Sequence, residues 1–293
     1  PIVSAINKLG ELDISHGSIR ADNIYYGEYP VLGECVSEPC GYAQPFYCEP
    51  IERMQALPAA KGEGSITHDY YALGPLGLYL MYTERHFDGM KPDTLLSEML
   101  HRGPYVTLMR NKEPSDSFSD FLRGTLSNNP NDRWNARHLK GWLDGKKLNV
   151  LLPPTPADAV RPFNYKDHEV YSRRELANLF FSDWAYFQEV MQTDQLSQWI
   201  LISMRNKDLS EAIKRIKQTI LNTGNKNELQ VSEQLMRVLL LLDPIGPIRI
   251  NNLAFHMDGI DGLATELFAN KALTEQKLLA KYMLEILNYL FHK

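Results

Sequence analysis

The sequence predicts a mainly α protein built from two parts. Apolar residues recur at spacings of three and four along most of the chain, which is the period of a helix with one buried face. Strand-like runs are few and short, and a proline-rich stretch separates the two halves. With 293 residues and 44% apolar content, the chain is large enough for two hydrophobic cores. We expect a first domain over 1–147, a linker over 148–160 and a helical domain over 161–293.

The first half begins with a segment that has a helical stripe of apolar residues at positions 2, 6, 9 and 12. Since Pro1 stands at what looks like the middle of a helix, we interpret the chain as a fragment of a longer protein. Two short strands are expected at 23–26 and 29–32. An apolar run that opens at Asp69 indicates a buried helix, and the residues 121–126 are typical of a later amphipathic helix.

Four short segments of this half, taken together and in their order along the chain, form a specific pattern. Residues 16–24 read His-Gly-Ser-Ile-Arg-Ala-Asp-Asn-Ile, and residues 47–52 read Tyr-Cys-Glu-Pro-Ile-Glu. Residues 69–74 read Asp-Tyr-Tyr-Ala-Leu-Gly, and residues 129–134 read Asn-Pro-Asn-Asp-Arg-Trp. This set resembles the C-terminal lobe of eukaryotic-like, bacterial-type serine/threonine protein kinases, with its catalytic loop, A-P-E, D-x-W-S-x-G and D-P-x-x-R motifs. The resemblance covers about residues 1–147, and no motif of the N-terminal lobe is present.

The resemblance implies that the catalytic loop is degenerate. In a loop of the form H-R-D-x-x-x-x-N, the Asp accepts the substrate hydroxyl proton and the Asn helps to hold a metal ion. His16 and Asn23 keep their places and Arg20 lies between them, but Ser18 stands where the catalytic Asp would be. A serine hydroxyl has a pKa far above neutral and does not replace a general base. We therefore expect no catalytic residue and a pseudokinase-like protein.

The metal-binding D-F-G motif would follow the second short strand, where the sequence reads Gly33-Glu34-Cys35-Val36. If Glu34 takes the place of the Asp, its carboxylate could still bind Mg²⁺, an ion that prefers oxygen ligands. If Gly33 takes that place, no ligand remains. Asn23 and Glu34 are thus the candidate residues for ATP and Mg²⁺. A metal site made of the cysteines and His16 has suitable ligand types but no familiar spacing.

Three further residues are expected to hold the kinase-like lobe together. By the resemblance, Asp69 accepts hydrogen bonds from the backbone of the catalytic loop. Arg133 pairs with the Glu of the A-P-E motif, which is Glu52, with Glu49 as the other candidate. The segment 36–48 is short and rich in turn residues, so it leaves little room for a phosphorylation-switched activation loop.

In the second half, the sequence predicts a hairpin over 162–171 that turns at Lys166-Asp167. Ser172 with Glu175 three residues later indicates a capping box at the start of a helix. We expect Gly259 and Gly262 to interrupt the chain between helices. The predicted helices that follow the first one span 183–193, 196–204, 209–222, 228–242, 263–270 and 274–291.

Composition restricts the possible functions. A net charge of −5 argues against non-specific nucleic-acid binding, and no apolar stretch is long enough to span a membrane. The three cysteines are sparse and odd in number, which favours free thiols in a reducing, cytoplasmic setting. The proline-rich stretch is expected to be a semi-rigid linker; its alternative role is as a ligand for a proline-binding module.

We expect a pseudokinase-like regulatory or scaffold protein in signalling that binds protein partners through the helical domain at 161–293. One alternative is a module that binds a nucleotide without consuming it. Another is a weakly active atypical serine/threonine kinase that works when the N-terminal lobe is present. A bacterial origin fits such a combination of domains.

Overall fold

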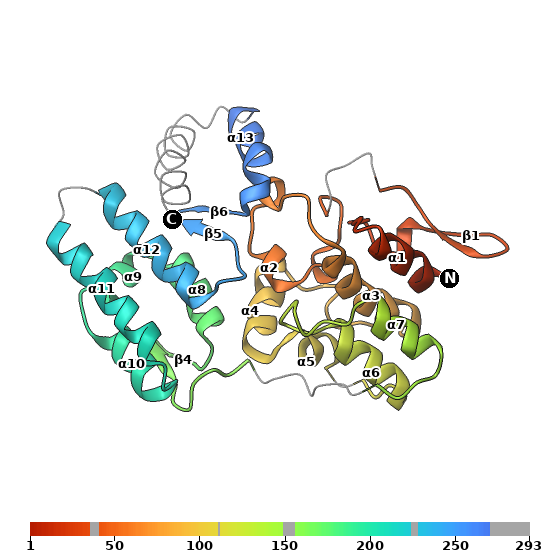
Figure 1. Cartoon of the computed structure of the whole chain (residues 1–293), viewed down its shortest axis with the longest axis horizontal. Coiled ribbons are helices and arrows are strands. Elements are labelled where there is room, and N and C mark those ends of the chain that lie inside the picture. The colour runs from red at the N-terminus through yellow and green to blue at the C-terminus, as the bar shows by residue number, and fades with distance from the viewer. Residues whose placement is uncertain (36–40, 111, 149–155, 224–227, 270–293) are drawn as a thin grey trace. The chain divides into compact units, whose positions relative to one another are not determined.

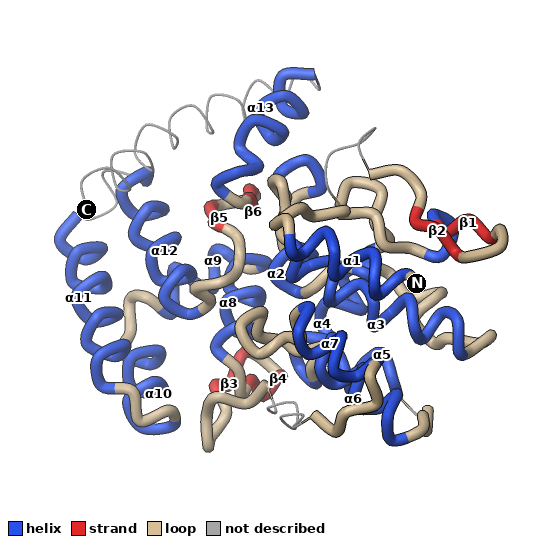
Figure 2. Tube along the Cα trace, turned by 45° about the vertical axis from the view of Figure 1, so that its right-hand side comes forward, coloured by secondary structure: helices blue, strands red, loops and turns tan. Residues whose placement is uncertain are grey.

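The computed structural model describes residues 1–35, 41–110, 112–148, 156–223 and 228–269. The protein is mainly helical, as predicted, and the strands in the described parts form three two-stranded antiparallel sheets (Figures 1 and 2). The chain divides into two compact units. The first contains Pro1–Met54 and Lys61–Pro156, and the second contains Gln55–Ala60 and Ala157–Lys293. None of the described helices is long and apolar enough to cross a membrane.

The first unit contains mainly helices and one hairpin. Its helices are α1 (Ile2–Glu11), α2 (Ile51–Met54), α3 (Ile66–Met81), α4 (Pro92–Arg102), α5 (Pro104–Met109), α6 (Asp116–Thr125) and α7 (Ala136–Leu143). Short 3-10 turns lie at η1 (Ala21–Asn23) and η2 (Phe46–Cys48). Strands β1 (Ile24–Tyr26) and β2 (Pro30–Leu32) pair with Ile24 opposite Leu32, which confirms the two predicted strands.

Helix α3 is the centre of the core of the first unit, because most of its residues are buried on all sides. It packs against α1 and α6. The approach to the end of α6 is close: a Cβ at Gly74 would lie 2.7 Å from a methyl carbon of Leu126, the residue that follows α6. The helix begins one turn earlier than the predicted Asp69, because the Ser65 hydroxyl and the His68 ring form a capping box at its N-terminus.

The second unit is formed mostly by the C-terminal half of the chain. Its helices are α8 (Arg173–Ser182), α9 (Trp184–Val190), α10 (Gln195–Ser203), α11 (Lys207–Thr223), α12 (Glu228–Leu242) and α13 (Ile260–Ala269). Its strands are β3 (Phe163–Tyr165), β4 (His168–Val170), β5 (Ile248–Ile250) and β6 (Leu253–Phe255), and its 3-10 turns are η3 (Pro58–Ala60) and η5 (Met257–Gly259). Stacked and edge-on rings of Phe163, Phe180, Phe187 and Trp199 fill one part of its core.

Several sequence predictions for this half are confirmed. The β3–β4 hairpin turns at Lys166-Asp167, and the Ser172 hydroxyl accepts the backbone N–H of Glu175 at 3.4 Å as the cap of α8. The expectation for Gly262 was wrong, because this residue lies inside α13 and does not interrupt the helix. The β5–β6 hairpin was not predicted. The predicted helix over 274–291 and the linker residues 149–155 lie outside the described residues.

Candidate functional site

The loop that resembles a kinase catalytic loop is fixed to the first turn of α3 by Asp69. This carboxylate is 1% exposed and accepts the backbone N–H of His16 at 2.6 Å and that of Gly17 at 2.8 Å. The Ser15 hydroxyl lies 3.3 Å from the same carboxylate. Burial raises the pKa of Asp69, and the two backbone N–H groups act in the opposite direction because they stabilise the charged form. Asp69 therefore positions the loop backbone, which is the contact implied by the resemblance.

The Asn23 side chain connects two backbone segments. Its amide nitrogen lies 3.0 Å from the carbonyl oxygen of Ser18 and 2.9 Å from that of Glu34, within donating distance of both. The Ser18 hydroxyl oxygen is also within reach, at 3.2 Å. On the other side, a Cβ at Gly33 would lie only 2.0 Å from the Asn23 amide oxygen. Asn23 is buried, and both ends of its amide face protein atoms.

His16 completes the same set of contacts. Its Nδ1 accepts the backbone N–H of Ser18 at 3.3 Å, and its Nε2 lies 3.2 Å from the carbonyl oxygen of Gly33. A ring that accepts at Nδ1 and donates at Nε2 satisfies both contacts as a neutral imidazole. Since His16 is 4% exposed, it holds the loop against residue 33 and does not face solvent.

The candidate metal ligands Asn23 and Glu34 lie next to each other. Glu34 uses its backbone carbonyl towards Asn23, and its residue surface is exposed. Arg20 lies 3.5 Å from the exposed carboxylate of Asp22 and donates to the carbonyl oxygen of Ala43 at 2.8 Å. Within the described residues, no group of three or more His, Cys, Asp and Glu side chains could hold a metal ion.

The cysteines differ in their surroundings. Cys35 is exposed and Cys48 is buried, whereas Cys40 lies outside the described residues. Burial strongly raises the pKa of the Cys48 thiol, and the neighbouring Glu49 carboxylate adds to the effect. Because the thiolate is the metal ligand and the nucleophile, this thiol is not prepared for either role.

The structure pairs Arg133 with Glu52. The Nη2 atom of Arg133 lies 2.9 Å from Oε1 of Glu52, and the two side chains are 1% and 6% exposed. The same guanidinium donates to the carbonyl oxygens of Thr67 and Ser127 at 3.0 and 3.2 Å. Glu49, the other candidate partner, instead contacts Lys61 at 2.5 Å. The Arg133–Glu52 pair therefore connects α2 with the segment before α7 in the interior of the first unit.

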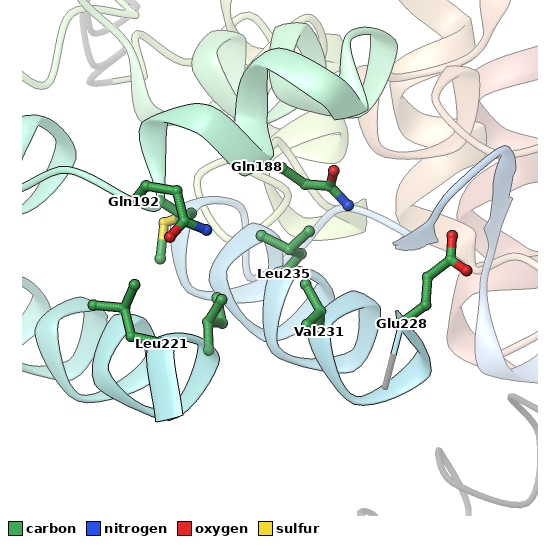
Figure 3. A pocket seen from close by; sticks show the side chains of 8 residues that line it. Gln188, Gln192, Leu221, Glu228, Val231 and Leu235 are labelled. Carbon is green, nitrogen blue, oxygen red and sulfur yellow. The ribbon is translucent and has the colours of Figure 1, made fainter. Parts of the chain in front are cut away.

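The second unit has a pocket that the sequence did not reveal. A cavity of about 310 Å³ lies among α9, α11 and α12, with an apolar wall that includes Met191, Ile220 and Leu235. Gln188 of α9 and Gln192, two residues after its end, line one side of the cavity, as Figure 3 shows. Its lining combines apolar side chains with two amides and a carboxylate, so it suits binding better than acid–base chemistry.

Comparison of the chain with protein-family models, curated protein sequences and solved structures finds no match. The kinase resemblance therefore depends on the motif residues themselves. The contacts of Asp69, Asn23, His16 and Arg133 describe what those residues do in this fold.

Proposed function

We propose that this chain is a pseudokinase-like regulatory or scaffold protein without phosphoryl-transfer activity, and that its C-terminal unit binds protein partners. One observation carries the proposal. Asn23, in the position that holds a metal in kinases, uses its amide nitrogen for the Ser18 and Glu34 carbonyl groups and faces Gly33 with its oxygen. The Asn23 side chain therefore holds the backbone of Ser18 and Glu34 together.

The chemistry of phosphoryl transfer supports the same conclusion. The reaction depends on metal ions that neutralise the phosphates and on a carboxylate that accepts the substrate proton. Position 18 offers a hydroxyl, and the candidate metal ligand Glu34 is exposed and bonds to Asn23 through its backbone carbonyl. These features support a protein without phosphoryl-transfer activity.

Two contacts to which the resemblance gives a structural role support the proposal. Asp69 holds the loop backbone, and Arg133 and Glu52 form a buried pair. These contacts fit a scaffold role, because they hold the fold together without touching a substrate. Resemblance to a fold does not by itself establish a reaction.

The test is an assay of phosphate transfer from ATP labelled at the γ position, made on the parent chain and on Ser18→Asp. We expect no transfer to the protein or to a general substrate from either form, because the Asn23 amide is bonded to the loop backbone and Glu34 is exposed. Transfer by Ser18→Asp would show that the remaining site is competent and would contradict the proposal. The conservative variant Ser18→Asn is the matched control, since it changes the volume in the same way without adding a base.

The alternative function is nucleotide binding, or weak atypical kinase activity, when an N-terminal lobe is present. The position of Glu34 favours this alternative. Its backbone carbonyl oxygen lies 2.9 Å from the amide nitrogen of Asn23, the residue with which it would share a metal ion. Metal-dependent nucleotide binding that is lost in Glu34→Gln would support this alternative.

A further inference from the structure

A short segment in the first half of the sequence belongs to the second unit. Gln55–Ala60 reads Gln-Ala-Leu-Pro-Ala-Ala and packs with the second unit, whereas the residues on both sides of it, Met54 and Lys61, belong to the first. The chain therefore leaves one unit, contributes six residues to the other, and returns. Within the second unit, this segment is held as a peptide ligand would be.

The segment pairs with strand β6 through its backbone. The N–H of Leu57 donates to the carbonyl oxygen of Ala254 at 2.9 Å, and the N–H of His256 donates to the carbonyl oxygen of Ala60 at 2.9 Å. The two bonds occur in the same order along both segments, so the segments run in the same direction. Between these two bonds the segment forms the 3-10 turn η3, in which the N–H of Ala60 donates to the carbonyl oxygen of Leu57 at 2.8 Å. The segment therefore bonds to the edge of the β5–β6 hairpin at two points and does not add a third strand to it.

Small residues make the close approach possible. A Cβ at Gly262 in α13 would lie 2.1 Å from the carbonyl oxygen of Ala59, a distance that no side chain could adopt without displacing the segment. Ala60 is completely buried in a cluster with Ile250, Leu253, Phe255 and other apolar residues. Gly262 is thus a specific requirement of this contact, although glycine weakens a helix by about 1 kcal/mol relative to alanine.

A buried polar cluster recognises the start of the segment. Arg249 is 1% exposed, and its Nη2 atom donates to the Gln55 amide oxygen at 2.5 Å and to Asp243 at 2.6 Å. Arg174 lies 3.3 Å from the other oxygen of Asp243. Two guanidinium groups share the one carboxylate of Asp243, so N–H groups are left to donate to another acceptor. An amide or carboxylate oxygen in the position of Gln55 fits this cluster, and a cation does not.

We propose that the edge of β6, the first turn of α13 and Arg249 form a peptide-binding groove that Gln55–Ala60 occupies within its own chain. The ligand class is a peptide that begins with Gln or Glu, continues with Ala-Leu-Pro, turns at the proline and ends with two small residues. The groove is the surface through which the second unit takes a partner peptide in place of its own segment. This inference rests on the proposed role of that unit in protein interaction.

The first experiment needs no substitution. In hydrogen exchange of the full chain, the Leu57 and His256 amides are expected to be protected because both bond across the groove. Addition of excess peptide with the sequence of residues 54–62 should speed exchange at Leu57, whose segment is displaced, while His256 stays protected by the incoming peptide. Exchange of both amides at the rate of an unfolded chain, before any peptide is added, would overturn the proposal.

The second experiment frees the groove without altering it. In Ala60→Glu, the buried alanine of the internal segment becomes charged, so a fluorescent copy of the native 54–62 peptide should bind at least about tenfold more tightly than to the parent, whose groove is occupied. Pro58→Glu adds the same charge at an exposed position of the same segment and should bind as the parent does. Adding Gly262→Val to Ala60→Glu should abolish binding, because the added side chain fills the groove.

The peptide itself tests the polar cluster. Glu in place of Gln55 should strengthen binding to the Ala60→Glu chain, and Lys in that place should abolish it. Equal binding of parent and Ala60→Glu, with unchanged circular dichroism, would overturn the groove. If Ala60→Glu does not fold, the peptide-induced exchange in the parent decides, and no change at Leu57 with excess peptide overturns it. Phosphate transfer by Ser18→Asp would refute the proposed function alone and leave the peptide results standing.

Discussion

Arg133→Ala is the change that tests the interior of the first unit most severely. The Arg133 guanidinium is 1% exposed and donates to the Glu52 carboxylate and to the carbonyl oxygens of Thr67 and Ser127. Its removal takes the guanidinium from the Glu52 carboxylate, which is 6% exposed and has the His68 Nε2 at 4.0 Å as its other basic neighbour. Loss of one member of a buried pair destabilises a protein by about 3–5 kcal/mol because the remaining charge is stranded. We expect a loss of that size, which raises the opening constant by about 10²–10⁴-fold.

The measurement is hydrogen exchange resolved to the peptides of α3 and α6, because it reports the free energy of opening of the first unit alone. The matched control is Arg137→Ala on α7, an exposed arginine whose removal should change the same free energy by less than about 0.5 kcal/mol. The double variant Arg133→Ala/Glu52→Ala should lose less stability than the two single losses together, since the partners are coupled. A loss for Arg133→Ala no larger than that of the control would refute the reasoning.

Three further predictions concern the loop and its surroundings. Gly33→Ala places a Cβ 2.0 Å from the Asn23 amide oxygen, so it should cost about 1–3 kcal/mol and speed exchange of the loop amides; an unchanged exchange pattern would contradict the contact. Burial raises the folded pKa of Asp69 above its unfolded value, so its ionisation costs stability above the folded pKa and that cost disappears below the unfolded one. The parent should therefore gain stability relative to Asp69→Asn as pH falls from 7 towards about 4, and a constant difference in urea denaturation would argue against this. Iodoacetamide should alkylate the exposed Cys35 in the native chain and the buried Cys48 only after unfolding, which peptide mass mapping would check; equal rates would be inconsistent with the burial of Cys48.

The parts of the fold that the sequence predicted depend on residues close to one another in the chain. The β1–β2 and β3–β4 hairpins and the Ser172 cap depend on neighbouring residues, and all are present. The buried helix α3 follows from its apolar run, although Ser65 starts it one turn earlier than expected.

Contacts between distant residues account for what the sequence could not show. The segment 55–60 has no helical or strand periodicity, and its polar anchor joins Gln55 to Arg249, 194 positions away. Gly262 reads as a helix breaker, yet it lies in α13 because only a residue without a Cβ fits against Ala59. Such a requirement becomes visible only when the two backbones are placed together.

The candidate site shows the same division. The resemblance assigned positions of the catalytic-loop motif to His16, Ser18 and Asn23. The direction of the Asn23 amide depends on the backbone carbonyl groups of Ser18 and Glu34. A motif defines the type of a side chain at a position, and tertiary hydrogen bonds decide whether that side chain is available to a ligand.

The most direct test of the pseudokinase account is a thermal melt with millimolar ATP, with and without Mg²⁺, on this chain and on a form extended to include any natural sequence that precedes Pro1. A ligand that binds only the folded state must raise the melting temperature. The account predicts no Mg²⁺-dependent shift, because Asn23 is committed to the backbone of its own loop. A saturable rise that requires Mg²⁺ and disappears in Glu34→Gln would contradict it and establish a nucleotide–metal site.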